Sequence, residues 1–246
     1  MTAIPPDRTR RAALVGAVCA LVVTGTALTG CSEDPDAGTN GVGKLSAEEI
    51  QAKTRAAAGS AQALRLSGNV ATSGRTYKLD MRLSADGGSG SVTAEGTTFQ
   101  LLRIGKELYL KAGAGFWADG KGGDTDAAAD KLDGKYVKVP SGDPAYKKFS
   151  GFTDKDVLLD GLLTLHGTLD TDGHHEQAGT RTIRITGDKG DGGTLDVSLE
   201  GQPYPLRLAR AGGAGTLTFS AWGKDFPLTE PEKDETVDYG KQLPTS

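Results

Sequence analysis

Ligand-type side chains are densest between residues 170 and 176, where two histidines and a glutamate follow two aspartates. The imidazoles of His174 and His175 and the carboxylate of Glu176 are groups that bind divalent metals. Adjacent residues of a strand point to opposite faces, however, and the Gly and Asp content here favours a solvated loop. The Asp-x-Asp-Gly fragment lacks the further ligands of a calcium loop. We predict no metal site and no cofactor.

Catalytic motifs are also missing from the sequence, which has no nucleophile elbow, zinc-protease motif, phosphate loop or dinucleotide fingerprint. The acidic residues between 119 and 130 are typical of a solvated loop, and His166 follows an apolar helix as a helix-end residue. Four aromatic residues are candidates for a pocket, although such positions more often belong to a core: Tyr109, Phe116, Trp117 and Trp222. We therefore predict a protein that is not an enzyme.

One cysteine has a more specific predicted chemistry. Cys31 follows Leu28-Thr29-Gly30, which ends an uncharged run over residues 12–28 that three arginines precede. A basic start, an apolar stretch and small residues before a cleavage site are the parts of a secretory signal. A transmembrane anchor is the alternative, but the run is shorter than the roughly 20 strongly apolar residues that span a bilayer. Since Cys19 lies inside the signal, the mature chain forms no internal disulfide.

The Leu-Thr-Gly-Cys sequence resembles the lipobox of bacterial lipoproteins. In that family the peptide is cut before the cysteine, whose sulfur carries two acyl chains. The resemblance implies that residues 1–30 are a lipoprotein signal peptide and that Cys31 is the lipidated, palmitate-bearing N-terminus. It also implies anchoring to the cell membrane on its extracytoplasmic face. A plain secretory signal with a coincidental cysteine is the other interpretation, and both Sec and twin-arginine export fit the signal.

Charge and composition limit the partners of the mature chain. The full sequence has 28 basic and 32 acidic residues, and residues 1–30 hold three arginines and one aspartate, which leaves 25 and 31 and a net charge near −6. This charge disfavours nucleic acid and anionic headgroups. Residues 31–44 are polar and rich in Gly, Asp and Pro, which predicts a flexible tether spanning roughly 20 Å. Residues 45–246 are predicted to form a single domain.

That domain begins with a strong helix signal. Ser46 and Glu49 form a capping box, and Leu45 and Ile50 occupy the hydrophobic staple positions. The helix is predicted to stop at Gly59.

Alternation of apolar and polar residues then predicts strands. A second capping box, with Thr153 at the N-cap and Asp156 three residues on, predicts a helix after residue 153. Residues 113–133 are predicted to be a loop or a short helix, and residues 143–149 a helical turn. The predicted strands cover residues 64–70, 77–83, 91–95, 99–104, 107–112, 136–139, 180–186, 195–199, 204–208 and 217–221.

The order of these features resembles the actinobacterial LppX/LprAFG-type lipoproteins, whose fold is similar to the periplasmic carriers LolA and LolB. The resemblance rests on residues 101–110 (LLRIGKELYL), Phe116-Trp117, residues 135–140 (KYVKVP) and residues 220–224 (SAWGK). It implies an α+β fold, with a strongly curved antiparallel sheet, a half-barrel, and helices packed on its concave face. Some members of the family hold an acyl chain between sheet and helices.

Two functions follow from these expectations. The first is a monomeric, membrane-anchored lipoprotein that binds or transfers lipid or glycolipid acyl chains in an apolar cavity. The second is an envelope interaction or scaffold lipoprotein with a packed core and no ligand. A cavity and a filled core need the same apolar residues, so the pattern does not separate them. The candidate lining residues are Leu66, Val70, Leu79, Met81, Phe99, Leu101, Leu108, Leu110, Val157, Leu158, Leu162, Ile183, Val197 and Phe219.

Overall fold

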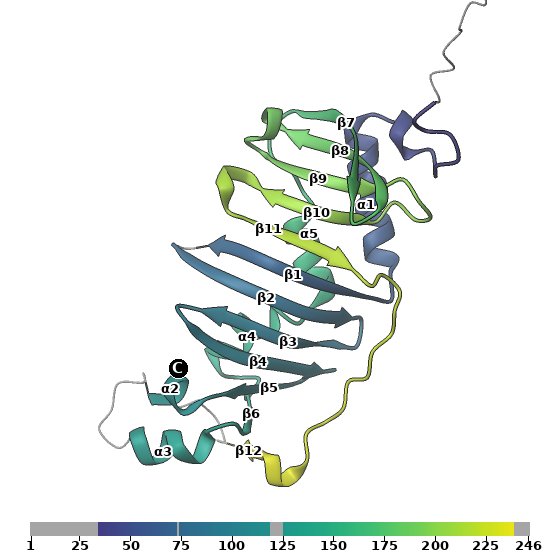
Figure 1. Cartoon of the computed structure of the whole chain (residues 1–246). Helices are drawn as coiled ribbons and strands as arrows, with labels where there is room; N and C mark the ends of the chain where they lie inside the picture. Colours follow the sequence, from purple (N-terminus) through teal and green to yellow (C-terminus); the bar gives the residue numbers. More distant parts are fainter. Residues whose placement is uncertain (1–33, 73, 119–124, 239–246) are drawn as a thin grey trace, which may run out of the picture. The chain divides into compact units, whose positions relative to one another are not determined.

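The computed structural model describes residues 34–72, 74–118 and 125–238, and Pro35–Ser246 form one compact unit. The predicted signal peptide and Cys31 lie outside the described residues. One open sheet of twelve strands dominates the part that is described (Figure 1), in the order β12-β6-β5-β4-β3-β2-β1-β11-β10-β9-β8-β7. The predicted α+β class with a curved antiparallel sheet is confirmed.

The sheet consists of two meanders that meet where β1 pairs with β11. Leu66 of β1 lies opposite Met81 of β2 on one side and opposite Phe219 of β11 on the other. The alternation of apolar and polar residues predicted most strands because each has one buried face. Their bounds are β1 Ala63–Thr72, β2 Arg75–Ser84, β3 Gly87–Ala94, β4 Thr97–Ile104, β5 Glu107–Ala112, β6 Tyr136–Lys138, β7 Leu169–Gln177, β8 Thr180–Gly187, β9 Gly193–Ser198, β10 Pro205–Arg210, β11 Gly215–Ser220 and β12 Thr236–Asp238.

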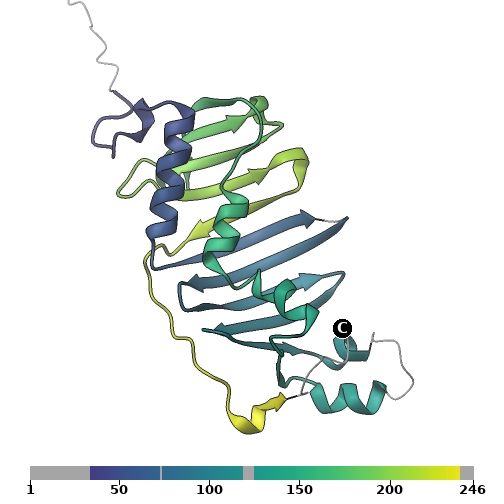
Figure 2. The same ribbon diagram turned by 180° about the vertical axis from the view of Figure 1, so that it is seen from behind.

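Three helices lie across one face of the sheet, which we call the covered face; the opposite face is the open face (Figure 2). These are α1 (Ala47–Ser60), α4 (Pro144–Ser150) and α5 (Lys155–Leu162). Two further helices, α2 (Ala114–Ala118) and α3 (Thr125–Leu132), form the connection between β5 and β6. The hydrophobic core lies between the covered face and the helices, because the inward residues of the strands are apolar.

Helix α1 begins as predicted. The Ser46 hydroxyl accepts from the Glu49 amide at 3.3 Å, and the Glu49 carboxylate accepts from the Ser46 amide at 3.0 Å. The predicted stop at Gly59 is wrong, because the helix continues through Ser60 to a C-cap at Ala61.

Helix α5 begins one residue later than predicted. Its N-cap is Asp154, whose carboxylate accepts from the Val157 amide at 3.0 Å, whereas Thr153 is buried and donates to the Ser150 carbonyl at 3.0 Å. Val157, a predicted lining residue, is 61% exposed, whereas Leu159 and Leu163 are buried, so α5 packs on the sheet with a different face from the one predicted. Including Val157 in the interior was wrong.

Residues 36–44 also differ from the predicted flexible tether, because they dock on β7, β8 and the β9–β10 loop. The Asn40 amide donates to the Leu199 carbonyl at 2.9 Å, and its side chain donates to the Ser198 and Gly201 carbonyls at 3.0 and 3.1 Å. Val42, in the short 3-10 helix η1 (Val42–Lys44), is buried. Polar composition concealed these contacts, since backbone carbonyls at the end of β9 supply the acceptors. We call residues 36–44 the N-terminal clasp.

The chain after β11 runs along the strand ends on one side of the sheet to its far edge (Figures 1 and 2). Residues 221–235, which we call the strap, end in the 3-10 helix η4 (Lys233–Glu235), and β12 then pairs in parallel with β6. The sequence predicted only an acidic tail here. Three residues are too few for an alternation signal, so β12 was not predictable from pattern.

Candidate functional site

The candidate lining residues gather on the covered face. All those on strands are buried except Val70, which is partly buried, as are Leu158 and Leu162 of α5. Every member except Val157 belongs to or packs against one core cluster. The pairing register explains this, because residues opposite one another share a face.

This interior is closely packed around its central side chains. Leu66, Met81, Leu108, Leu110 and Val197 have no exposed surface. A side chain without accessible surface touches no water-sized space, inside or outside the protein. An acyl chain can therefore reach these residues only if the helical cover moves.

A groove of about 470 Å³ separates α1 from α5 at the surface of that cover. Leu159 and Leu163 are the buried residues of its lining, and Arg55 and Asp160 form an ion pair that joins the two helices. The groove thus has apolar residues beneath a charged rim. Its full lining is Arg55, Gly59, Asp156, Leu159, Asp160 and Leu163.

Polar contacts fasten α5 to α1. The Lys155 ammonium, whose side chain is 4% exposed, donates to the Gly59 carbonyl at 2.7 Å and lies 2.9 Å from the Asp156 carboxylate. A cation near the C-terminal end of α1 is favoured by the helix dipole. The Leu165 amide donates to the Gln51 side chain at 2.9 Å. These contacts hold the groove walls together.

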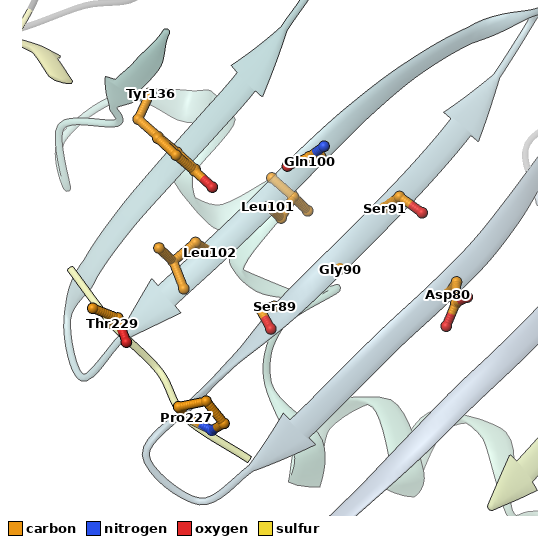
Figure 3. Close-up of a pocket in the computed structure, with 10 residues that line it drawn as sticks. All are labelled: Asp80, Ser89, Gly90, Ser91, Gln100, Leu101, Leu102, Tyr136, Pro227 and Thr229. Atoms are coloured by element: carbon orange, nitrogen blue, oxygen red, sulfur yellow. The ribbon is translucent and has the colours of Figure 1, made fainter. Parts of the chain in front are cut away.

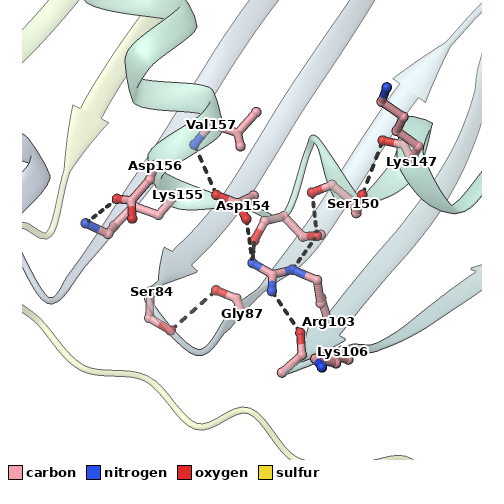
Figure 4. Close-up of polar contacts among 12 residues, drawn as sticks. Ser84, Gly87, Arg103, Lys106, Lys147, Ser150, Asp154, Lys155, Asp156 and Val157 are labelled. Carbon is pink, nitrogen blue, oxygen red and sulfur yellow. Dashed lines mark hydrogen bonds and ion pairs between the residues drawn. The ribbon is translucent and has the colours of Figure 1, made fainter. Parts of the chain in front are cut away.

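Arg103 of β4 fastens the connection between α4 and α5 to the sheet (Figure 4). Its side chain is 12% exposed and donates to the Thr153 hydroxyl at 3.2 Å, the Thr153 carbonyl at 2.9 Å and the Gly105 carbonyl at 2.9 Å. The sequence contains a signal for this contact. Arg103 follows Phe99 and Leu101 in the inward register, and an arginine there needs partners above the sheet.

Aromatic residues fill the space beneath α4. The ring of Phe99 contacts those of Phe116 and Phe149 at 5.4 and 5.5 Å between centroids. Trp117 is buried and donates to the Ala112 carbonyl at 3.3 Å. Of the four predicted pocket aromatics, Phe116 and Trp117 thus belong to the core. Trp222 stacks on Tyr204 at 4.6 Å, and Tyr109 points to the open face.

The open face over β8–β10 carries a buried charge network. The Asp196 carboxylate is 1% exposed and accepts from the Arg184 guanidinium at 2.6 and 3.1 Å, with Arg207 at 4.0 Å. Hydrogen bonding to Asp196 raises the pKa of Arg184. A charge buried in this way destabilises the fold if one of its partners is removed.

The side chains of His174 and His175 do not point toward a common site. Its segment is strand β7 with a bulge, not the predicted loop, and His174 and His175 lie opposite Ile183 and Thr182, which point to opposite faces of the sheet. His174 contacts the Asp36 carboxylate of the N-terminal clasp at 3.1 Å. Within the described residues, no three ligand-type side chains are placed to hold a metal.

Tyr109 joins the strap to the open face, and its pKa predicts that the free energy of unfolding depends on pH. Burial and the hydrogen bond to Glu230, at 2.9 Å, raise the pKa of Tyr109 to about 12 from its ordinary 10. The folded state therefore keeps a proton that the unfolded chain loses, and this stabilisation is complete below pH 10 and is lost as the pH rises to 12. The free energy of unfolding should fall by up to about 2.7 kcal/mol over this range.

Urea unfolding of the wild type and Tyr109→Phe at pH 9, 10, 11 and 12 measures this contribution. The difference between the two proteins should narrow above pH 10, because phenylalanine has no proton to lose. A constant difference would show that Tyr109 titrates at its ordinary pKa.

The fold defines a class of protein, the open and curved antiparallel sheet with helices on one face. Among solved structures it is similar to LprF from Mycobacterium bovis, with a TM-score of 0.54 and 15% identity over 75% of this chain and 96% of that one. The lipoprotein LppX from Mycobacterium tuberculosis also matches, with a TM-score of 0.45 and 16% identity over 74% and 99% of the two chains. The predicted resemblance to the LppX/LprAFG type is confirmed at the level of fold.

Comparison by sequence found no matching family model and no matching curated protein. Within the described residues, no helix has the length and apolar character needed to cross a bilayer.

Proposed function

We propose that this chain is a membrane-anchored envelope lipoprotein that binds lipid acyl chains between the covered face and its helices. The observation that carries the proposal is a broad apolar sheet face beneath two short helices, α4 and α5, which polar contacts fasten. The lipobox-like sequence at Cys31 and the fold shared with LprF support it. Palmitate on Cys31 and the extracytoplasmic location belong to this proposal.

Acyl chains would enter at the groove between α1 and α5. Leu159 and Leu163 there are continuous with the core, so a chain that parts the helices meets apolar surface at once. Each methylene transferred from water contributes roughly 0.8 kcal/mol, and breaking the Lys155 and Arg103 contacts opposes entry. The role requires no chemical step, so we propose a monomeric carrier that is not an enzyme and uses no cofactor.

A second function has one observation in its favour. The central covered-face side chains have no exposed surface, as in a core that holds no ligand. A scaffold lipoprotein that recruits a partner through its surface would need only this packed state.

Native and denaturing mass spectrometry of the full chain, purified from membranes of an actinobacterial host, separate the two functions. We expect the native mass to exceed the denatured mass by one or more lipid molecules, because only a non-covalent ligand is lost on denaturation. Equal masses would contradict lipid binding and favour the scaffold.

The denatured mass tests the anchor in the same samples. It should exceed the mass of the chain from residue 31 by the covalent acyl groups, and Cys31→Ala should carry no acyl group on any form of the chain. An unmodified wild-type mass would contradict lipidation without bearing on the interior.

A further inference from the structure

A polar trough of about 480 Å³ lies on the open face, on the other side of the sheet from the proposed lipid site (Figure 3). Its base is a row of directly paired residues: Asp80 on β2, Ser91 on β3 and Gln100 on β4. The row continues through Lys111 on β5 to Tyr136 on β6. The strap closes one end with Pro227 and Thr229. Its volume is in the range of small-molecule sites.

The uncharged polar side chains that the strands contribute to this trough differ from their neighbours in having no hydrogen-bond partner within the described part of the protein. Elsewhere on the open face, polar side chains pair, as Thr93 does with Thr98 and Lys138 with Glu107. Among the described residues, no side-chain hydrogen bond joins Ser89, Ser91, Gln100 or Tyr136 to the protein. Their hydroxyl and amide groups therefore remain available to a ligand.

Two charged contacts hold the ends of the row in place. Both oxygens of the Asp80 carboxylate accept from Arg65, at 2.8 and 2.7 Å, and this hydrogen bonding lowers the pKa of Asp80. The Lys111 ammonium lies over the Tyr136 ring, 4.7 Å from its centroid. A carboxylate at one end and an aromatic ring at the other are thus fixed before any ligand arrives, which reduces the entropy cost of binding.

We propose that this trough binds a neutral saccharide. Sugar hydroxyls both donate and accept, which matches a lining of serine and tyrosine hydroxyls, an amide and a carboxylate. The apolar face of a sugar ring suits Tyr136 and the partly covered Leu102. Other ligands fit less well. Asp80 is the one charged residue among the described residues that line the trough, and its carboxylate opposes an anion, while the Lys111 ammonium is placed over the Tyr136 ring. β3 and β4 are paired on both sides, which leaves no edge for a peptide strand.

The sheet separates this trough from the covered face, so its saccharide is not the headgroup of a lipid held inside. The site is therefore independent of the proposed lipid binding.

Saturation-transfer NMR on the full chain tests the proposal with glucose, galactose and mannose. Each sugar is offered free, as a soluble oligosaccharide, and as a glycolipid in detergent, to distinguish the sources of the same chemistry. We expect transfer to ring protons of at least one sugar, with affinity in roughly the millimolar range. Signal from the glycolipid alone, or from no probe, would overturn the proposal.

Variants decide whether the signal comes from the trough. Ser91→Phe fills its base with a residue that strands favour and should abolish the signal, and Tyr136→Ala should weaken binding about tenfold or more. The matched control is Thr218→Ala, an exposed polar residue on β11 of the same face, which should bind as the wild type does. Binding that survives Ser91→Phe in a folded protein, as judged by circular dichroism, would also overturn the proposal.

Discussion

Replacing Arg103 by methionine is expected to lower the free energy of unfolding by about 3 kcal/mol. The variant loses four hydrogen bonds, two of them to Thr153, whose buried carbonyl then has no donor from this side chain, and one to the Asp154 carboxylate. A net hydrogen bond contributes about 1 kcal/mol, and a buried polar group left without its partner costs more. Denaturation in urea, followed by circular dichroism, measures the change.

Arg103→Met should take up lipid faster than the wild type, although it is less stable. Arg103 joins β4 to the connection between α4 and α5, so its loss frees one end of the cover while the apolar covered face stays intact. We expect a fluorescent fatty acid to enter several-fold faster than in the wild type. Unchanged uptake in a measurably destabilised protein would show that the cover does not limit entry.

Arg82→Met is the control for both measurements. Arg82 lies on β2, two residues from Asp80, and its side chain is exposed on the open face. Because surface substitutions of this kind change stability by less than about 0.5 kcal/mol, the control should match the wild type in stability and uptake.

Replacing Asp196 by alanine is expected to cost about 3 kcal/mol or more. Asp196 is almost fully buried and is held by Arg184 at 2.6 Å, with Arg207 nearby. Removing the carboxylate takes away both close hydrogen bonds of the partly buried Arg184 and leaves Asp172 as its carboxylate contact, at 3.8 Å. Breaking a buried pair typically costs 3–5 kcal/mol. Chemical denaturation at pH 7 measures the loss.

A double variant separates charge from packing. In Arg184→Met with Asp196→Leu, both charges are replaced by apolar groups, and stability should recover most of the loss. Glu95→Gln, which removes an exposed ion pair with Arg75, should change stability by less than about 0.5 kcal/mol. If the double variant were as unstable as Asp196→Ala, packing around the network, and not unpaired charge, would explain the cost.

Local signals predicted the elements that neighbouring residues determine. The α1 capping box and the alternation of β1, β2, β4 and β5 need only a few residues of context, and each appears in the structure. The start of α5 was misplaced because Thr153 and Asp154 are both good caps, and in the structure Thr153 is instead held by Arg103 while Asp154 caps the helix. That contact joins residues fifty apart in the chain, beyond the reach of a local pattern.

The candidate sites show the same division. Inward apolar positions were predictable from their period, whereas the trough on the open face was not, because Asp80, Ser91, Gln100 and Tyr136 meet only through the pairing of five strands. Its end wall comes from Pro227 and Thr229, in a segment whose composition indicated a tail. The polar row and the end wall of the trough both depend on contacts between distant residues, which local propensity does not encode.

The N-terminal clasp shortens the length of free chain between the proposed anchor and the folded domain. If Cys31 carries the acyl chains as we propose, five peptide units separate it from Asp36, a reach of at most about 18 Å. Because Asp36 contacts His174 on β7 and Ala37 accepts from Arg181 on β8, this short length of chain would keep the clasp's contact with these two strands near the membrane surface. The β12 edge lies at the opposite end of the strand order, so it would be the edge of the sheet farthest from that contact.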